Sequence, residues 1–291
     1  MSFVKFFKYF FQSIIIYLFF IIIKIIGLAL SRKFFSFLFN IIGPLIKSKQ
    51  TVNNNLDKFL GFHNVDIKKK IKFQMWTNYG KTFVEYLYLK KFKNMNAHIE
   101  IKGEEILDEI KKKNKPVIFV SGHFANFELM SMELTKKNIN LATIYRPLNN
   151  FFLNPFMEYL RKKYICQNQI KKGLPGVKNS INFIKNNISI ALMIDQRVSE
   201  GKRLPFFEHM ALTSTLPAQM ALKFNLDIVP IYIARNANDS FEMKICDPIK
   251  VEDNNDTESN KLNISIKLNK ILEEMISQDP GQWIWTHNRW K

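Results

Sequence analysis

The chain has 291 residues, and 47% of them are hydrophobic, which excludes a globally disordered protein because there is ample apolar material for a core. Its 43 lysines and arginines against 25 acidic residues give a formal net charge of +18, which predicts an anionic partner: a phospholipid surface, an acidic protein or nucleic acid. The two cysteines, Cys166 and Cys246, fit no metal or redox spacing and favour a reducing, cytosolic setting for the main domain.

The N-terminal region is strongly apolar. From Phe6 to Leu30 the chain is long enough to cross about 30 Å of hydrocarbon, with Lys24 snorkelling or facing protein. The next apolar run, Phe34 to Ile46, is too short to cross and indicates an interfacial helix. No convincing cleavage site of a signal peptide follows either run. We therefore predict a membrane anchor over residues 1–47 and one catalytic domain over 48–291. The larger basic load after the first run weakly favours a cytoplasmic position for that domain.

Strand-like and helix-like patterns alternate through the remainder of the chain, which predicts an α/β domain with a mixed sheet flanked by helices. Buried strands are expected at Pro116–Val120, Leu141–Tyr145 and Ile188–Ile194, and further strands at 98–101, 227–234 and 241–245. Helices are expected at 126–137, 152–164 and 216–224. The segments 171–176 and 198–215 are expected to be loops.

The turn after the strand at Pro116–Val120 carries the first candidate for chemistry. His123 lies between this strand and the following helix, and Glu128 lies about one helical turn into that helix. A carboxylate that holds one imidazole nitrogen would leave the other free as a base, which is what deprotonation of a hydroxyl nucleophile requires. The alternative is a structural histidine that caps the helix, beside an ordinary surface glutamate. His287 is a second candidate base, but no acid stands at a matching offset.

Several short motifs in this order make a more specific pattern. Together they resemble the late acyltransferases of bacterial lipid A biosynthesis, the lauroyl/myristoyl transferase family, over nearly the whole chain. The motifs are Gly122-His-Phe-Ala-Asn-Phe-Glu128, Tyr145-Arg-Pro147, Asp195-Gln196, Pro205-Phe-Phe207, Pro217-Ala218 and Pro280-Gly-Gln-Trp-Ile-Trp-Thr-His-Asn-Arg-Trp-Lys291. One departure is Phe127, where the family usually has tryptophan.

The resemblance implies a fold of the lysophospholipid-acyltransferase type on the cytoplasmic side of the bacterial inner membrane. It also implies acyl transfer from acyl carrier protein to a hydroxyl of a lipid A precursor, with direct attack on the thioester and neither cofactor nor metal. His123 would be the catalytic base and Glu128 would hold its ring. The partners would be the carrier protein, a glycolipid acceptor and an anionic bilayer surface.

The same resemblance supplies the predicted substrate-binding residues. Arg146 is the leading cation for the developing oxyanion, although it could be a surface arginine before a turn proline. Asp195 would orient Arg146 or a substrate hydroxyl, or simply cap its loop. Asn126 belongs to the histidine motif. Arg289 is expected in a membrane-facing aromatic and basic rim with Trp283, Trp285 and His287.

Two other functions remain open at this level. The acceptor could be another glycolipid or a lysophospholipid, although glycerophosphate and lysophospholipid acyltransferases usually carry aspartate at the position of Glu128. A non-catalytic, membrane-tethered lipid-binding protein is the alternative from a different class. We expect no nucleic-acid partner, because the sequence holds no nucleic-acid-binding motif.

Overall fold

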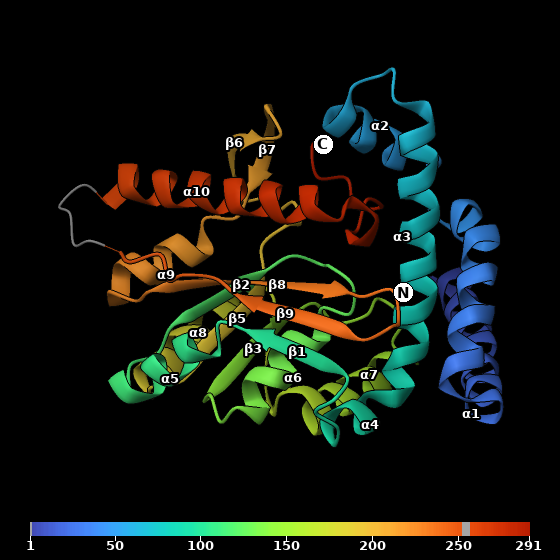
Figure 1. The fold of residues 1–291 in the computed structure, drawn as a ribbon, viewed down its shortest axis with the longest axis horizontal. Helices are drawn as coiled ribbons and strands as arrows, with labels where there is room; N and C mark the ends of the chain where they lie inside the picture. Colours follow the sequence, from blue (N-terminus) through green and yellow to red (C-terminus); the bar gives the residue numbers. More distant parts are fainter. Residues whose placement is uncertain (1, 252–256) are drawn as a thin grey trace.

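A seven-stranded mixed sheet forms the centre of the protein, as the alternating pattern predicts (Figure 1). The computed structural model describes residues 2–251 and 257–291. Its sheet has the order β1-β9-β8-β2-β5-β3-β4; β8 and β9 pair antiparallel, and the other neighbours pair parallel. The strands are β1 (Ile99–Lys102), β2 (Ile118–Ser121), β3 (Leu141–Tyr145), β4 (Asn168–Lys171), β5 (Ser189–Met193), β8 (Ile228–Arg235) and β9 (Phe241–Ile245).

Helices cover both faces of this sheet. Figure 1 shows α9 and α10 on one face and α5 and α6 on the other, with the long α3 crossing one end. Because both faces are covered, β2 is buried along its whole length, which explains its unbroken apolar run. The helices are α1 (Phe3–Ile46), α2 (Lys49–Leu60), α3 (Val65–Glu85), α4 (Leu89–Lys93), α5 (Glu104–Lys113), α6 (Glu128–Lys136), α7 (Asn154–Leu160), α8 (Leu174–Lys185), α9 (Leu216–Phe224) and α10 (Thr257–Gln278).

Two predicted loops contain regular structure instead. The segment predicted as a flexible basic loop, 171–176, holds the end of β4 and the start of α8, where Pro175 stands in the first helical turn. The segment 198–215 contains a separate antiparallel hairpin, β6 (Lys202–Phe206) and β7 (His209–Thr213). A proline inside β6 concealed this strand from sequence patterns, because proline cannot donate to a strand ladder.

The apolar N-terminal segment forms one long helical element, α1, with a kink at Gly27. Gly27 has φ 79°, in the left-handed region that favours glycine, and it divides the element into two arms. The break therefore falls at Gly27 and not at Ser31–Lys33, where the sequence suggested it. Among the described residues, α1 is the one helix long and apolar enough to cross a membrane, by length and composition. Its first arm alone rises about 36 Å, so it could serve as a membrane anchor.

The second arm of α1 lies against α3 and is not a free interfacial helix. Phe35 is fully buried, with its ring 5.4 Å from that of Phe83 on α3. The two backbones meet closely at Gly80, where a Cβ would lie 2.3 Å from the Phe35 carbonyl oxygen. On the first arm, Lys24 faces protein, because its Nζ donates to the Leu87 carbonyl at 2.8 Å. Hence α1 combines an exposed apolar face with a face packed on α3.

A buried ionic cluster around Glu85 ties α1 to the remainder of the protein. The Glu85 carboxylate is fully buried at the end of α3 and accepts from the Arg32 Nε of α1 at 2.8 Å. Arg235 of β8 binds both Glu85 oxygens, at 3.0 Å from Nη2 to Oε2. Asn126 Nδ2 donates to Oε2 at 2.9 Å. Two arginines and an amide thus compensate one buried carboxylate, which would otherwise be strongly destabilising.

Candidate active site

The carboxyl ends of two neighbouring parallel strands bring His123 and Asp195 together. β2 pairs with β5 from Ile118–Ile190 to Ser121–Met193, and the Ile194 N–H then donates to the Ser121 carbonyl at 2.9 Å. Asp195 directly follows Ile194, and His123 comes two residues after Ser121, so both residues leave the sheet at the same edge, where α/β folds usually place their ligands. The 72-residue separation of His123 and Asp195 in the sequence is closed by this strand pairing alone.

Asp195 holds His123 by both backbone and ring. Its Oδ1 lies 2.7 Å from His123 Nδ1, and its Oδ2 accepts the His123 backbone N–H at 2.8 Å. Trp283 Nε1 donates to the same Oδ2 at 2.8 Å, which locks the carboxylate from behind. With Nδ1–H donated to Asp195, His123 Nε2 carries the free lone pair of the neutral ring. A base held by a carboxylate in this way is suited to taking a proton from a hydroxyl.

The Asp195 carboxylate stays ionised despite full burial. Burial alone would raise its pKa, but attraction to the His123 ring and the hydrogen bonds from His123 and Trp283 outweigh it and lower the pKa to about 2. A permanent negative charge therefore faces the Nδ1 side of His123 at neutral pH. That charge stabilises an imidazolium form when His123 accepts a proton.

A cavity of about 480 Å³ opens in front of His123. This volume lies in the range of small-molecule sites. Its wall combines apolar side chains, including Ile144 and Leu192, with the polar groups of His123, Gln196 and Arg146. Gln196 Nε2 lies 3.5 Å from His123 Nε2, at the face where a substrate hydroxyl would bind. Among the residues that the structure describes, no group of three or more His, Cys, Asp or Glu could hold a metal ion.

The predicted contact between Glu128 and His123 is wrong. Glu128 opens α6, but its Oε1 accepts from Arg161 Nε at 2.8 Å, from Arg161 Nη2 at 2.6 Å and from the Tyr86 hydroxyl at 2.8 Å. The guanidinium supplies a two-pronged, charge-assisted partner, and Asp195 already occupies the His123 Nδ1 position. Spacing along the helix could not reveal either competitor. Glu128 lines the cavity wall with Arg161, beside the histidine but not against it.

Arg146 lies where the sequence suggested, at the carboxyl end of β3 and on the cavity wall. It is exposed, so its guanidinium is free to meet a substrate group. Lys172, which the sequence placed only in a basic loop, lines the same cavity. Burial and then the nearby charge of Arg146 lower the pKa of Lys172. The pairing of β3 with β4 brings Lys172 to the cavity, because its backbone N–H donates to the Tyr145 carbonyl at 2.8 Å.

Two predicted substrate-binding residues face the protein interior. Asn126 is 2% exposed and belongs to the Glu85 cluster; it is not among the described residues that line the cavity. Arg289 is fully buried: its Nη1 donates to the Leu212 carbonyl and its Nη2 to Thr213 Oγ1 at 2.9 Å. Burial lowers the pKa of Arg289 to about 10. Both residues therefore support the site from within.

The C-terminal tryptophan segment is the back wall of the site and not a membrane-facing rim. Trp283 and Trp285 are 1% and 0% exposed, and Trp283 reaches Asp195 as described above. His287 accepts the Arg197 N–H on its Nε2 at 2.9 Å, and burial lowers its pKa to about 4. His287 is therefore neutral, with that nitrogen already engaged, which leaves His123 as the free base of the cavity.

Comparison with known proteins agrees with this architecture. A model of the family described as bacterial lipid A biosynthesis acyltransferase matches residues 4–291. A lipid A biosynthesis palmitoleoyltransferase of Escherichia coli (strain K12) is 22% identical over 256 residues, which cover 85% of this chain and 80% of the relative. A lipid A biosynthesis acyltransferase of Shigella flexneri matches with the same identity and coverage. Because the family match spans nearly the whole length, including α1, the chain belongs to the bacterial lipid A biosynthesis acyltransferase family.

Proposed function

We propose that this protein is a membrane-anchored O-acyltransferase that moves a fatty acyl chain from acyl carrier protein to a hydroxyl of a lipid A precursor. The observation that carries the proposal is the Asp195–His123 pair at the edge of a 480 Å³ cavity with Arg146 on its wall. Family membership supports acyl transfer, and the names of the two relatives support lipid A as the acceptor class.

In the proposed mechanism, His123 Nε2 takes the proton of the acceptor hydroxyl while Asp195 stabilises the resulting imidazolium. The alkoxide oxygen attacks the thioester carbonyl carbon, and a carbon–oxygen bond forms as the carbonyl becomes a tetrahedral oxyanion. Arg146 and Lys172 supply positive charge on the cavity wall for that oxyanion. Collapse breaks the carbon–sulfur bond, and the departing thiolate takes the proton from His123 Nε2. No acyl-enzyme is needed.

The acidic carrier protein is the proposed donor, because a chain of net charge +18 offers basic surface for its docking. The acceptor is proposed to stay in the bilayer that α1 enters. Residues 1–47 serve as the anchor and 48–291 as the catalytic domain, on the cytoplasmic face of the inner membrane. In this arrangement the Glu128–Arg161 pair forms part of the cavity wall, and Asp195 takes the orienting role that the sequence suggested for Glu128.

The test is acyl transfer by purified full-length protein and by its His123→Ala variant, with acyl carrier protein as donor and a lipid A precursor as acceptor. The variant should lose essentially all turnover but stay folded. Its thermal unfolding temperature should fall only modestly, because Asp195 loses the imidazole but keeps the His123 backbone N–H and Trp283 Nε1 as hydrogen-bond donors. Near-native turnover by folded His123→Ala protein would refute the mechanism. Turnover with coenzyme A thioesters alone would refute the donor.

A further inference from the structure

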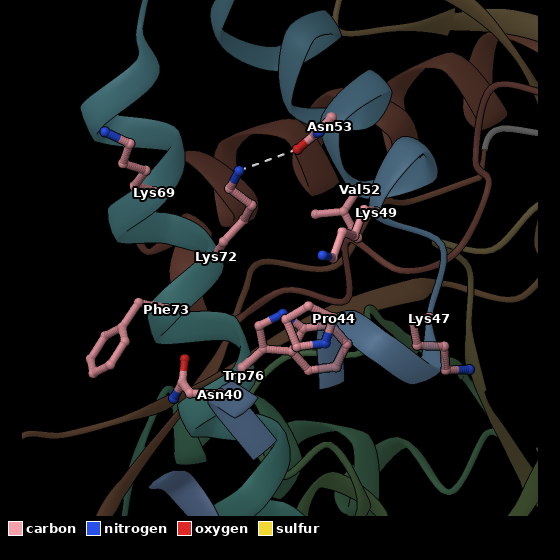
Figure 2. Close-up of a pocket in the computed structure, with 10 residues that line it drawn as sticks. All are labelled: Asn40, Pro44, Lys47, Lys49, Val52, Asn53, Lys69, Lys72, Phe73 and Trp76. Carbon is pink, nitrogen blue, oxygen red and sulfur yellow. Dashed lines mark hydrogen bonds between the residues drawn. The ribbon is translucent and has the colours of Figure 1, made fainter. Parts of the chain in front are cut away.

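A second cavity lies outside the catalytic site, between the end of α1, α2 and α3. Its volume is about 310 Å³. Figure 2 shows Lys49 on α2 and Lys72 on α3 extending from the two helices toward the space between them. Lys69 lies about one helical turn before Lys72 on α3. None of the ten described residues that line the cavity is acidic. The cavity, named here the basic groove, therefore concentrates positive charge in a concave site.

The floor of the basic groove is apolar. Trp76 and Val52 are 6% and 3% exposed and form it together with Pro44. Trp76 is fixed from below by α1, because a Cβ on Gly43 would lie 2.3 Å from the Trp76 ring. Phe73 is 62% exposed at the side of the groove. A ligand that fits this site has an anionic group for the lysines and a hydrocarbon portion for the aromatic surface.

The groove lies at the end of the apolar part of α1. The exposed apolar face of α1 runs to Leu45 and Ile46, which are 74% and 70% exposed. The first lysine of the groove, Lys47, is the next residue. This change from apolar to basic marks the level of lipid headgroups when an apolar helix lies in a bilayer. Lys47 also lines the catalytic cavity, so the groove borders the site where the acyl acceptor would enter.

Within the groove, the lysines are available for an anion. Among the residues that the structure describes, Lys72 Nζ donates to an uncharged partner, Asn53 Oδ1, at 3.2 Å and forms no ion pair. Lys69 pairs with Asp66 at 3.2 Å, but that aspartate side chain is 95% exposed, so the pair is weak. An incoming phosphate would therefore gain the ammonium groups of Lys49 and Lys72 without breaking a buried ion pair.

We propose that the basic groove binds the phosphate headgroup of an anionic phospholipid in the bilayer that α1 enters, with the start of its hydrocarbon part on Trp76 and Phe73. The bound lipid holds the mouth of the catalytic cavity at the membrane surface. An acidic protein is the less favoured occupant, because docking of a folded protein needs no apolar floor in a concave site. The proposal rests on the membrane placement of α1 and not on the acyl transfer itself.

Binding is tested by native mass spectrometry of the full-length protein in uncharged detergent, with dihexanoyl phosphatidylglycerol as the probe. The double variant Lys49→Gln/Lys72→Gln should bind the probe about 30-fold more weakly, since each lysine near an anionic headgroup contributes about a factor of five. The matched control is Lys112→Gln/Lys178→Gln, on α5 and α8, which lie far from α2 in Figure 1. It removes the same charge and should bind like the wild type.

Each other outcome overturns the proposal. Equal loss in both double variants would mean diffuse charge attraction, and no loss in either would mean that the groove is empty of lipid. Competition by inorganic phosphate at the same concentration as the lipid would remove the role of the apolar floor. Weaker binding of acyl carrier protein, with unchanged lipid binding, would make the groove a protein docking site. All four outcomes are read without turnover, so failure here is distinct from failure of the acyltransferase mechanism.

Discussion

Replacing Asp195 by asparagine changes the charge and donor pattern at His123 with almost no change of shape. In the native protein, Asp195 accepts three N–H groups: His123 Nδ1–H on Oδ1, and the His123 backbone and Trp283 Nε1 on Oδ2. An asparagine has one acceptor oxygen, and that oxygen is best kept opposite the two donors at Oδ2. The amide NH₂ then faces His123 Nδ1 and donates to it. The ring must consequently carry its proton on Nε2, where the substrate hydroxyl needs a lone pair.

The expected fall in kcat follows from this tautomer, in which His123 carries its proton on Nε2 and cannot act as the base. General base catalysis contributes about 10² to 10⁴ in rate, so we expect kcat of Asp195→Asn to fall about 1,000-fold, or about 4 kcal/mol in activation free energy. KM for both substrates should change little, because Asp195 is fully buried behind His123 and does not line the cavity among the described residues. The loss belongs to the chemical step.

Steady-state kinetics of the purified full-length variant, with acyl carrier protein and a lipid A precursor, measure this. Glu128→Gln is the comparison, since it alters the other carboxylate near His123 but leaves the Asp195 contact intact. This variant should lower the free energy of unfolding, because the ion pair with Arg161 is lost, while its kcat should stay close to the native value. The reasoning fails if folded Asp195→Asn protein keeps more than a tenth of native kcat. It also fails if the loss of kcat in folded Glu128→Gln protein exceeds the loss in Asp195→Asn protein.

Three further outcomes are expected. The Asp195 pKa lies at about 2 in the folded protein against an ordinary value of 3.8, so its contribution of about 2 kcal/mol is present above pH 3.8 and is lost as pH falls through about 2; thermal unfolding from pH 5 to 2 should show this slope in wild type and lack it in Asp195→Asn. Raising salt should weaken the apparent affinity for acyl carrier protein, and an unchanged KM would assign the basic surface another purpose. A protein truncated to begin at Ser48 should lose about 3 kcal/mol or more of stability, because Glu85 loses Arg32; chemical denaturation that matches full-length protein would contradict the packing of α1 on α3.

The sheet was predictable wherever a strand is buried on both faces. The runs that became β2, β3, β5 and β8 are largely apolar, whereas β1 and β9 alternate apolar with charged residues. All six positions agree with the prediction within two residues at either end. The hairpin β6–β7 was not, since its strands carry Pro205 and charged residues and gain their order from pairing with each other. Local patterns cannot report a partner that lies several residues away.

The active site divides in the same way. His123 and Arg146 follow buried strands, so sequence could place them at the correct sheet edge. The partner of His123 depends on strand order, because β2 pairs with β5 rather than with β3, and a single sequence does not fix that order. Likewise, the tryptophans of the C-terminal segment resemble an interfacial rim in composition alone. Only the folded chain places Trp283 behind Asp195 and Arg289 against β7.

The Glu85 cluster has a consequence for the life of the newly made chain. Its carboxylate is shared by Arg32 of α1, Arg235 of the sheet and Asn126, three residues after His123. A polypeptide whose α1 has not yet folded onto α3 buries that charge with one arginine too few, beside the loop that carries the base. We expect such a chain to open readily there and to be degraded by cellular proteases. The charge balance at Glu85 therefore couples the stability of the sheet to the packing of α1 on α3.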